Sequence, residues 1–314
     1  MPGVPEVFAN LVWLVIILIN EDLPTLERPI NAYSGLLGGG QPSTVGLLIR
    51  YVAERISIVV CTFAGMQSDN SDTVVKILPD AGSNLSKKAQ VAEMFNNIAG
   101  KYDFLNHFLS MGIDKGWRKK AIREVGMMKP KQILDVATGT GDLAIAAADL
   151  QPDKITGIDI ATQMLDEGRK KIAEKRLDKL IQLQEGDSEA LQFADNNFDI
   201  VMCAYGVRNF EHLEAGLKEM NRVLRKGGKL VILEFSHPKQ FQVKQFYQFY
   251  FKYILPFFGK LFSKHSRAYT YLPESVMAFP EGKAFCDILS KCGYTDIKAR
   301  PLTFGVTTLY TAFK

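Results

Sequence analysis

The chain has 314 residues, 47% of them hydrophobic and 23% charged, which excludes a disordered or fibrous protein and leaves ample length for a buried core. The net charge of +4 at pH 7 is small, so it excludes a protein that binds nucleic acid through its overall charge. The four cysteines lack metal-ligand spacing and the four histidines are scattered, so we expect a reduced interior and no metal site.

Residues 1–65 differ in composition from the rest of the chain. They contain no lysine, whereas 26 lysines lie in residues 66–314. The apolar run 11–19 is shorter than the roughly 20 residues of a membrane helix, and it lacks the features of a secretory signal. We interpret residues 1–85 as an extension or leader. Residues 1–65 have three interpretations: a weak membrane anchor, an extension specific to one protein family, or sequence upstream of a true start at Met66.

Helix and strand patterns alternate from residue 86 onwards. Apolar spacing after Ser86 predicts a helix capped by that serine, and a second helix is predicted at 117–125 before Pro130. Strands are predicted at 132–137, 154–158, 181–184, 198–204 and 229–234, with helices at 142–149, 162–175 and 212–225. A helix at 282–292 and strands at 296–301 and 303–312 close the chain. The alternation favours one α/β domain, residues 86–314, with helices on both faces of a mostly parallel sheet.

A glycine turn follows the first of these strands, within residues 133–144. Gly139 and Gly141 allow the backbone to turn tightly and to approach a ligand closely. Asp135 lies near the end of the strand, where its carboxylate can face a positively charged ligand. The spacing from Gly139 to Ala144 also fits a dinucleotide-binding turn, and glycine spacing alone leaves both cofactors open.

Acidic residues also stand at the ends of the next two strands. Asp159 can accept hydrogen bonds from ribose hydroxyls, and Asp187, followed by Ser188, can accept one from an adenine amino group. Asp142 and Asp187 can instead be helix caps. Three acidic strand ends in a row favour S-adenosylmethionine, because a dinucleotide needs a clear helix N-terminus for its pyrophosphate.

Three segments carry a resemblance to the menaquinone and ubiquinone biosynthesis C-methyltransferases. They are Tyr-Asp-Phe-Leu-Asn at 102–106 with Trp117, Tyr-Gly-Val-Arg-Asn at 205–209, and residues 222–228 continuing to Leu-Glu-Phe-Ser at 233–236. The chain resembles that family from about residue 86 to residue 314. It departs from the family pattern at Leu105 and Asp114, where methionine and histidine are usual, and at Lys226, where proline is frequent. Ala204 replaces a serine of some ubiquinone-making members, which favours the menaquinone branch.

The resemblance implies a Rossmann-like class I methyltransferase fold with seven strands, the last one antiparallel. It implies methyl transfer from S-adenosylmethionine to a ring carbon of demethylmenaquinol, without a metal. A polyprenyl methoxybenzoquinol is the alternative substrate, with RNA methylation or a non-catalytic role in a quinone-synthesis complex as further alternatives. We also expect a cytoplasmic protein, peripheral at the inner membrane face, and a possible homodimer. The implied cofactor contacts are Thr140, Asp159, Asp187 and Ser188.

A ring carbon is a poor nucleophile until an adjacent phenol loses its proton, so the quinol is the expected substrate. Arg208 is the candidate that stabilises the phenolate, or else it forms a structural ion pair. Asn209 is expected to hydrogen-bond a quinol oxygen. The proton acceptor is Tyr205, Asp103 or a water held by Arg208. The expected lid, which binds the substrate unless it is only a helix-to-turn boundary, comprises Tyr102, Asp103 and Asn106.

Residues 235–273 contain no acidic residue, six basic residues and thirteen aromatic ones. We interpret 235–279 as an insertion that covers the substrate. Aromatic residues from Phe246 to Tyr253 surround a predicted helix on nearly every side, until Pro256 interrupts it. Aromatic residues interleaved with lysines predict contact with an anionic membrane surface, or else a capping subdomain packed on the sheet. We expect no nucleic-acid partner, because the rest of the chain shows no matching basic groove.

Overall fold

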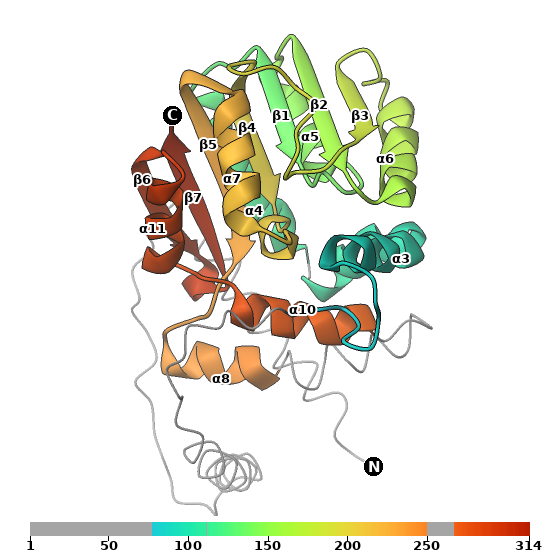
Figure 1. The fold of residues 1–314 in the computed structure, drawn as a ribbon, viewed down its shortest axis with the longest axis vertical. Helices are drawn as coiled ribbons and strands as arrows, with labels where there is room; N and C mark the ends of the chain where they lie inside the picture. The colour runs from blue at the N-terminus through green and yellow to red at the C-terminus, as the bar shows by residue number, and fades with distance from the viewer. Residues whose placement is uncertain (1–76, 111, 250–266) are drawn as a thin grey trace, which may run out of the picture. The chain divides into compact units, whose positions relative to one another are not determined.

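The computed structural model describes residues 77–110, 112–249 and 267–314 (Figure 1). Within them seven strands form one sheet in the order β3-β2-β1-β4-β5-β7-β6. Strands β1 to β5 are parallel, β7 runs antiparallel to β5, and β6 runs antiparallel to β7. The strands are β1 Gln132–Val136, β2 Lys154–Asp159, β3 Ile181–Glu185, β4 Phe198–Ala204, β5 Leu224–Phe235, β6 Thr295–Leu302 and β7 Thr307–Phe313. This arrangement confirms the predicted α/β fold with an antiparallel last strand.

The helices alternate with the parallel strands, as their apolar spacing predicted. They are α3 Lys87–Leu109, α4 Ile113–Gly126, α5 Asp142–Ala147, α6 Thr162–Glu174, α7 Leu213–Val223, α8 Phe241–Phe249, α10 Arg267–Ala278 and α11 Lys283–Lys291. Ser86 caps α3, because its hydroxyl accepts a hydrogen bond from the Ala89 N–H at 3.2 Å. Among the described residues, no helix is both long and apolar enough to cross a membrane. The predictions for residues 1–65 lie outside the described residues.

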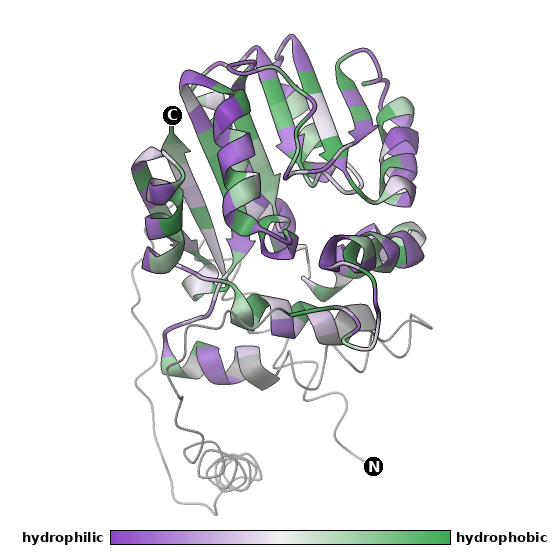
Figure 2. Cartoon of the chain, in the orientation of Figure 1, coloured by the Kyte–Doolittle hydropathy of each residue, from purple (hydrophilic) through white to green (hydrophobic). Residues whose placement is uncertain are grey.

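Two hydrophobic cores lie on opposite faces of the sheet. Successive side chains of a strand point to opposite faces, so Ile200 packs with α4, α5 and α6 while the next residue, Val201, packs with α7 and α11. The side of α7 turned toward the viewer is largely hydrophilic (Figure 2). The central strands, such as β1 and β4, are therefore buried on both faces, and the edge where the parallel strands end is left for a ligand.

Several predicted boundaries shift in the structure, and three of these shifts show a local cause or continuation. The helix predicted to Arg225 ends at Val223, because Leu224 already pairs with Phe198 as the start of β5. The helix predicted to Asp149 ends as α5 at Ala147 and continues as a 3₁₀ turn. The last strand begins at Thr307, after a 3₁₀ turn that contains the positive-φ residue Phe304.

Helices α3 and α10 lie at the carboxyl ends of the parallel strands (Figure 1). Chain order reverses between β1 and β4, which are neighbours in the sheet, so a ligand is expected outside this edge. α10 packs against α3 and against the 3₁₀ turn η2, Val207–Asn209. The strand ends therefore form the floor of the candidate site, and the helices form its cover.

Candidate active site

Two pockets lie between the strand ends and the helices that cover them. The first contains about 670 Å³ and the second about 850 Å³ of empty space, including space open to solvent. Phe95 and Tyr102 of α3, together with Tyr205 after β4, line both of them. We call them the strand-end pocket and the helix-side pocket. Because they share three side chains, ligands in the two pockets would lie next to each other.

The strand-end pocket is lined by the turns that follow four parallel strands. Gly139 lines it with a φ of +57°, in the left-handed region that favours glycine. Gly206 also lines it, and a side chain there would meet the Ala137 Cβ at 2.6 Å and the Cys203 Sγ at 2.8 Å. The chain thus requires glycine at both points, where it passes close beneath the pocket floor.

Asp159 lines the strand-end pocket from the end of β2. Its Oδ2 accepts a hydrogen bond from the Gly139 N–H at 2.8 Å, and its Oδ1 accepts one from the Ala161 N–H at 2.8 Å. Burial raises the pKa of this carboxyl, and the backbone N–H groups partly offset that effect. A carboxylate has about four acceptor sites, so Asp159 can hold the glycine turn and still accept hydrogen bonds from a ligand.

Asp135 lies beneath the glycine turn and is not among the residues that line the pocket. It is 1% exposed, and its Oδ2 accepts a hydrogen bond from the Thr138 hydroxyl at 2.6 Å. Its Oδ1 has no hydrogen-bond partner among the described residues. Burial raises the pKa of Asp135 to about 7. This carboxyl is therefore poised to ionise when a cation approaches.

Thr140 and Gly141 belong to the glycine turn, but they do not line the strand-end pocket. The Thr140 hydroxyl donates to the Asp103 Oδ1 at 2.5 Å, and the Lys171 ammonium lies 2.6 Å from the Asp103 Oδ2. This contact corrects the expected position of Asp103, which lines neither pocket. Asp103 is held by a hydroxyl and a lysine, so it ties α3 to the glycine turn instead of facing a substrate.

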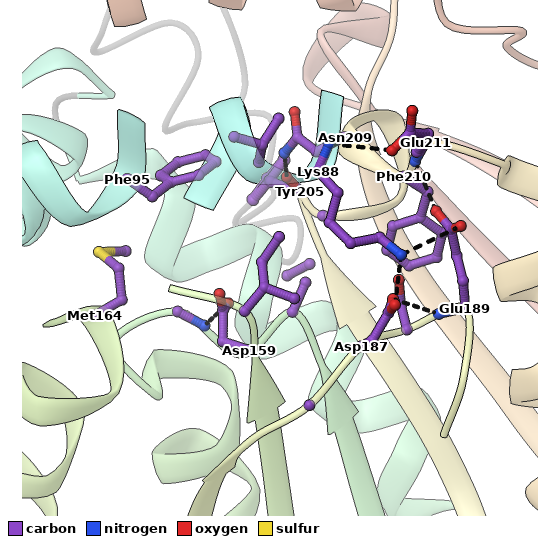
Figure 3. A pocket seen from close by; sticks show the side chains of 18 of the residues that line it. Lys88, Phe95, Asp159, Met164, Asp187, Glu189, Tyr205, Asn209, Phe210 and Glu211 are labelled. Carbon is purple, nitrogen blue, oxygen red and sulfur yellow. Dashed lines mark hydrogen bonds and ion pairs between the residues drawn. The ribbon is translucent and has the colours of Figure 1, made fainter. Parts of the chain in front are cut away.

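Asp187 and Ser188 line the strand-end pocket after β3, as the sequence predicted. Asp187 forms an ion pair with Lys88 of α3, whose ammonium also lies 3.6 Å from Glu189 (Figure 3). Burial lowers the pKa of Lys88, but the two carboxylates outweigh it and raise that pKa. Sequence reasoning missed Lys88 and Glu189, because nothing in the sequence pairs a residue of the first helix with the end of the third strand.

The helix-side pocket is mainly aromatic and aliphatic. Tyr102 and Asn106, two of the expected lid residues, line it. The other lining residues include Leu105, Asp114, Trp117, Arg118, Arg208, Phe235, Tyr271 and Leu272. The pocket therefore has apolar walls with a few polar groups between them, which suits a flat ring that carries oxygen substituents.

Asp114 is the acidic residue among those that line the helix-side pocket. The Ser110 hydroxyl donates to its Oδ1 at 2.5 Å, His107 Nδ1 lies 2.9 Å from its Oδ2, and Arg118 pairs with it. Burial raises the pKa of Asp114, but its hydrogen bonds and Arg118 outweigh burial and lower it. The carboxylate is held by three donors and stays ionised, and its contacts join α3 to α4.

Arg208 lines the helix-side pocket from the turn after β4. Its Nη1 lies 2.8 Å from the Oε1 of Glu234, which is fully buried at the end of β5, and also donates to the Tyr205 carbonyl. Its Nε has no partner among the described residues. Arg208 therefore forms the structural ion pair that was the alternative interpretation of this residue. Its Nε remains a donor without a partner among the described residues. Glu234 lies in the segment 233–236 that carries the family resemblance, but its ion pair with Arg208 was not predicted.

Tyr205 lies where the two pockets meet. It has a φ of +59°, uncommon for a tyrosine, and its ring lies 4.4 Å from that of Phe235. Its hydroxyl lies 3.4 Å from the Thr307 Oγ1, and burial raises its pKa. The phenol thus stays protonated at neutral pH, which speaks against its expected role as a proton acceptor.

Asn209 lines the strand-end pocket and not the helix-side pocket, contrary to the expectation that it contacts the substrate (Figure 3). Its Nδ2 lies 3.5 Å from the Tyr205 carbonyl, and its buried Oδ1 has no partner among the described residues. Since η2 turns Arg208 and Asn209 in different directions, neighbouring residues serve different pockets.

The aromatic insertion is described in part, as α8 and α10. The predicted helix beyond Phe249 and the break at Pro256 lie outside the described residues. Phe241 is 74% exposed and Met277 67% exposed, whereas Tyr271 is 3% exposed and lines the helix-side pocket. The insertion thus includes both a pocket wall and exposed apolar side chains.

Comparisons with known proteins agree on the described domain. The model of the ubiE/COQ5 methyltransferase family matches residues 83–314. A demethylmenaquinone methyltransferase of Bacteroides fragilis is 49% identical over 234 residues, 74% of this chain and 96% of that protein. A ubiquinone/menaquinone biosynthesis C-methyltransferase UbiE of Geotalea daltonii is 44% identical over 73% of this chain and 97% of its own. A crystal structure of a putative S-adenosyl-L-methionine-dependent methyltransferase from Methanococcus maripaludis has a TM-score of 0.48 at 17% identity, covering 79% of this chain and 97% of that one.

Proposed function

The chain belongs to the ubiE/COQ5 methyltransferase family, and from this premise we propose that it methylates a ring carbon of demethylmenaquinol, with S-adenosylmethionine as methyl donor. The relatives named demethylmenaquinone methyltransferase support this substrate over others. A polyprenyl methoxybenzoquinol is the second candidate, because a relative at 44% identity carries both quinones in its name. The observation that carries the proposal is the pair of adjoining pockets, one acidic at the strand ends and one aromatic beside it.

The residues of the strand-end pocket fit S-adenosylmethionine, which supplies an electrophilic methyl group when bound. Asp159 and Asp187 would accept hydrogen bonds from its ribose hydroxyls and adenine amino group. Asp135 does not line the pocket, but its carboxyl beneath the glycine turn, with an Oδ1 unpaired among the described residues, would attract a cation bound nearby, such as the ammonium of the methionyl part. Lys88, the basic residue that lines this pocket, is already paired with two carboxylates, so the pocket offers little to a pyrophosphate. This set of donors and acceptors favours the sulfonium cofactor over a dinucleotide.

The helix-side pocket fits the ring of a quinol. The rings of Tyr205 and Phe235 lie 4.4 Å apart, and the Trp117 ring packs at 6.4 Å and 6.5 Å from them. Trp117 is fixed by a hydrogen bond from its Nε1 to the Thr303 Oγ1 at 2.7 Å. Fixed aromatic walls would hold a flat ring in one orientation, which is the positioning that methyl transfer between two bound molecules requires.

Arg208 would stabilise negative charge on the quinol oxygen next to the accepting carbon. The guanidinium lies over the Phe235 ring at 5.4 Å and is held in place by Glu234. A donor that is already held in place needs no rearrangement as the phenolate forms.

Two of the three expected proton acceptors lose support in the structure. Tyr205 has a raised pKa, and Asp103 lines neither pocket. We therefore favour a water molecule beside Arg208 as the acceptor of the quinol proton. This assignment agrees with the choice of the reduced substrate, since only the quinol carries that proton.

We further propose that the insertion contacts an anionic membrane surface, from which the quinol enters. Lys239, Phe241 and Lys244 are exposed at the start of α8. Phe241 and Lys244 are three residues apart on the helix and so share one face. An exposed aromatic ring beside lysines is the combination that binds the interface of anionic lipids.

The test is turnover by the full chain with isotope-labelled S-adenosylmethionine and demethylmenaquinol, reduced chemically and carried in vesicles with or without anionic lipid. We expect labelled menaquinol from the reduced substrate, none from the oxidised one, and faster turnover with anionic vesicles. Product only from a methoxybenzoquinol would establish the second candidate. Product from neither quinol, with cofactor bound, would refute the proposed reaction.

A further inference from the structure

Tyr271 of α10 is buried without a hydrogen-bond partner. It is 3% exposed and lines the helix-side pocket, and its hydroxyl bonds to no atom of the described residues. Leaving a buried polar group unpaired destabilises a protein, so such a group calls for an explanation. A ligand in the helix-side pocket that accepts a hydrogen bond from the Tyr271 hydroxyl would provide this explanation.

Two other buried tyrosines of the described residues, Tyr294 and Tyr310, do have hydrogen-bond partners. The Tyr294 hydroxyl donates to the Leu217 carbonyl at 3.0 Å, and the Tyr310 hydroxyl accepts a hydrogen bond from the Gly282 N–H at 2.8 Å. These two hydroxyls serve the fold. Tyr271 differs from them because it lines the helix-side pocket and its buried hydroxyl has no partner among the described residues.

A second unpaired donor lies in the same pocket. The Nη1 of Arg208 is taken up by Glu234 and by the Tyr205 carbonyl, but its Nε has no partner among the described residues. Burial raises the pKa of Tyr271 to about 12, against the opposing effect of the positive charge on Arg208. Both side chains line the helix-side pocket, and the raised pKa keeps Tyr271 a neutral donor. A guanidinium has no acceptor atom, so Arg208 cannot accept a hydrogen bond from the Tyr271 hydroxyl.

We propose that the Tyr271 O–H and the Arg208 Nε–H together bind the quinol oxygen adjacent to the methylated carbon, as a two-donor site for the phenolate. This makes Tyr271 a catalytic residue of the reaction, and it rests on the proposed function. Both donors lack partners among the described residues, so no hydrogen bond between those residues has to break before the site accepts an anionic oxygen.

The two donors act while the charge on that oxygen changes. Loss of the phenolic proton to water leaves a phenolate, whose ring carbon forms a new C–C bond to the methyl group as the C–S bond breaks and its electron pair goes to sulfur. The oxygen is then a carbonyl, and the ring carbon still bears its hydrogen. Loss of that hydrogen as a proton restores the aromatic ring, and the oxygen takes up a proton, so one proton is released overall. Tyr271 keeps its own proton throughout.

The experiment compares Tyr271→Phe with Tyr294→Phe in the full chain. Both remove one buried hydroxyl. We expect Tyr271→Phe to lower kcat about 100-fold, the loss typical of one oxyanion donor, with little change in the dissociation constant of S-adenosylhomocysteine. Its Tm should stay the same or rise, because no hydrogen bond within the protein is lost. Tyr294→Phe should lower Tm and leave kcat unchanged.

A structural role for Tyr271 would not give a dependence on substrate acidity. The Tyr271→Phe variant should recover part of its rate with a quinol analogue made more acidic by a halogen on its second ring, and its kcat should rise toward higher pH more than that of the wild type. Wild-type turnover with unchanged kcat in Tyr271→Phe would overturn the inference but leave the proposed function standing. A fall in Tm and kcat together, without rescue by the acidic quinol, would also overturn it. Absence of wild-type turnover refutes the proposed function itself.

Discussion

The two pockets are built in different ways, although they share a wall. The strand-end pocket takes most of its lining from turns at the ends of β1, β2, β3 and β4, which are neighbours in one sheet, together with residues of α3. The helix-side pocket takes its groups from α3, α4 and α10 and from the ends of β4 and β5, so Asn106 and Tyr271 meet across more than 160 residues of chain. The first pocket follows from the sheet, whereas the second depends on how the helices pack over it.

This difference predicts separable effects of substitution. Changes at the strand ends should act on cofactor affinity, and changes in the helix-side pocket should act on turnover. A variant that altered both quantities equally would mean that the two pockets are one energetic unit.

The largest effect is expected for Asp159→Ala. It removes the acceptor proposed for the ribose hydroxyls and also the contacts to the Gly139 and Ala161 N–H groups, so the glycine turn loses its anchor. Calorimetry should detect no binding of S-adenosylhomocysteine. The matched control is Asp166→Ala on α6, an exposed carboxylate paired with Arg169, which should bind normally. Unchanged affinity in Asp159→Ala would remove this residue from the cofactor site.

The next effect concerns Arg208, whose removal alone would leave the buried Glu234 without its partner. The double variant Arg208→Met, Glu234→Gln avoids that stranded charge. We expect its kcat to fall about 100- to 1,000-fold below that of Glu234→Gln, with cofactor affinity within roughly threefold. Steady-state kinetics with reduced quinol would measure this. Equal kcat values for the single and double variants would leave Arg208 a purely structural role.

The smallest effect is a pH dependence of cofactor binding. Below pH 7 the free protein holds a proton on Asp135, whose pKa is raised to about 7 by burial, and a cationic ligand has to displace it. Affinity for S-adenosylhomocysteine, which keeps the ammonium, should therefore fall about tenfold for each pH unit below 7 and level off above it. Calorimetry at pH 6 and pH 8 should show this slope in the wild type and lose it in Asp135→Asn. The same slope in both proteins would assign it to another group.

The sequence was sufficient to predict the sheet and much of the strand-end pocket. Strand patterns fix which residues follow β2 and β3, and the edge rule for parallel sheets then brings Asp159 and Asp187 together. The position of Asp103 could not be predicted in this way, because it depends on which face of α3 meets Thr140 and Lys171. Glu234 and Tyr271 were missed for a related reason. A carboxylate in a strand and a tyrosine in an aromatic run show nothing unusual until their neighbours in space are known.

Helix α3 has a consequence for the order of events in a catalytic cycle. It supplies Lys88 to one pocket and Asn106 to the other, while Phe95 and Tyr102 line both. A displacement of α3 that admits one ligand would therefore also change the binding site of the second ligand. Under the proposed function, exchange of the nucleoside cofactor and exchange of the quinol would therefore be coupled through this one helix. Release of both products and entry of the next two ligands would then share one motion, the departure of α3 from the ends of the strands.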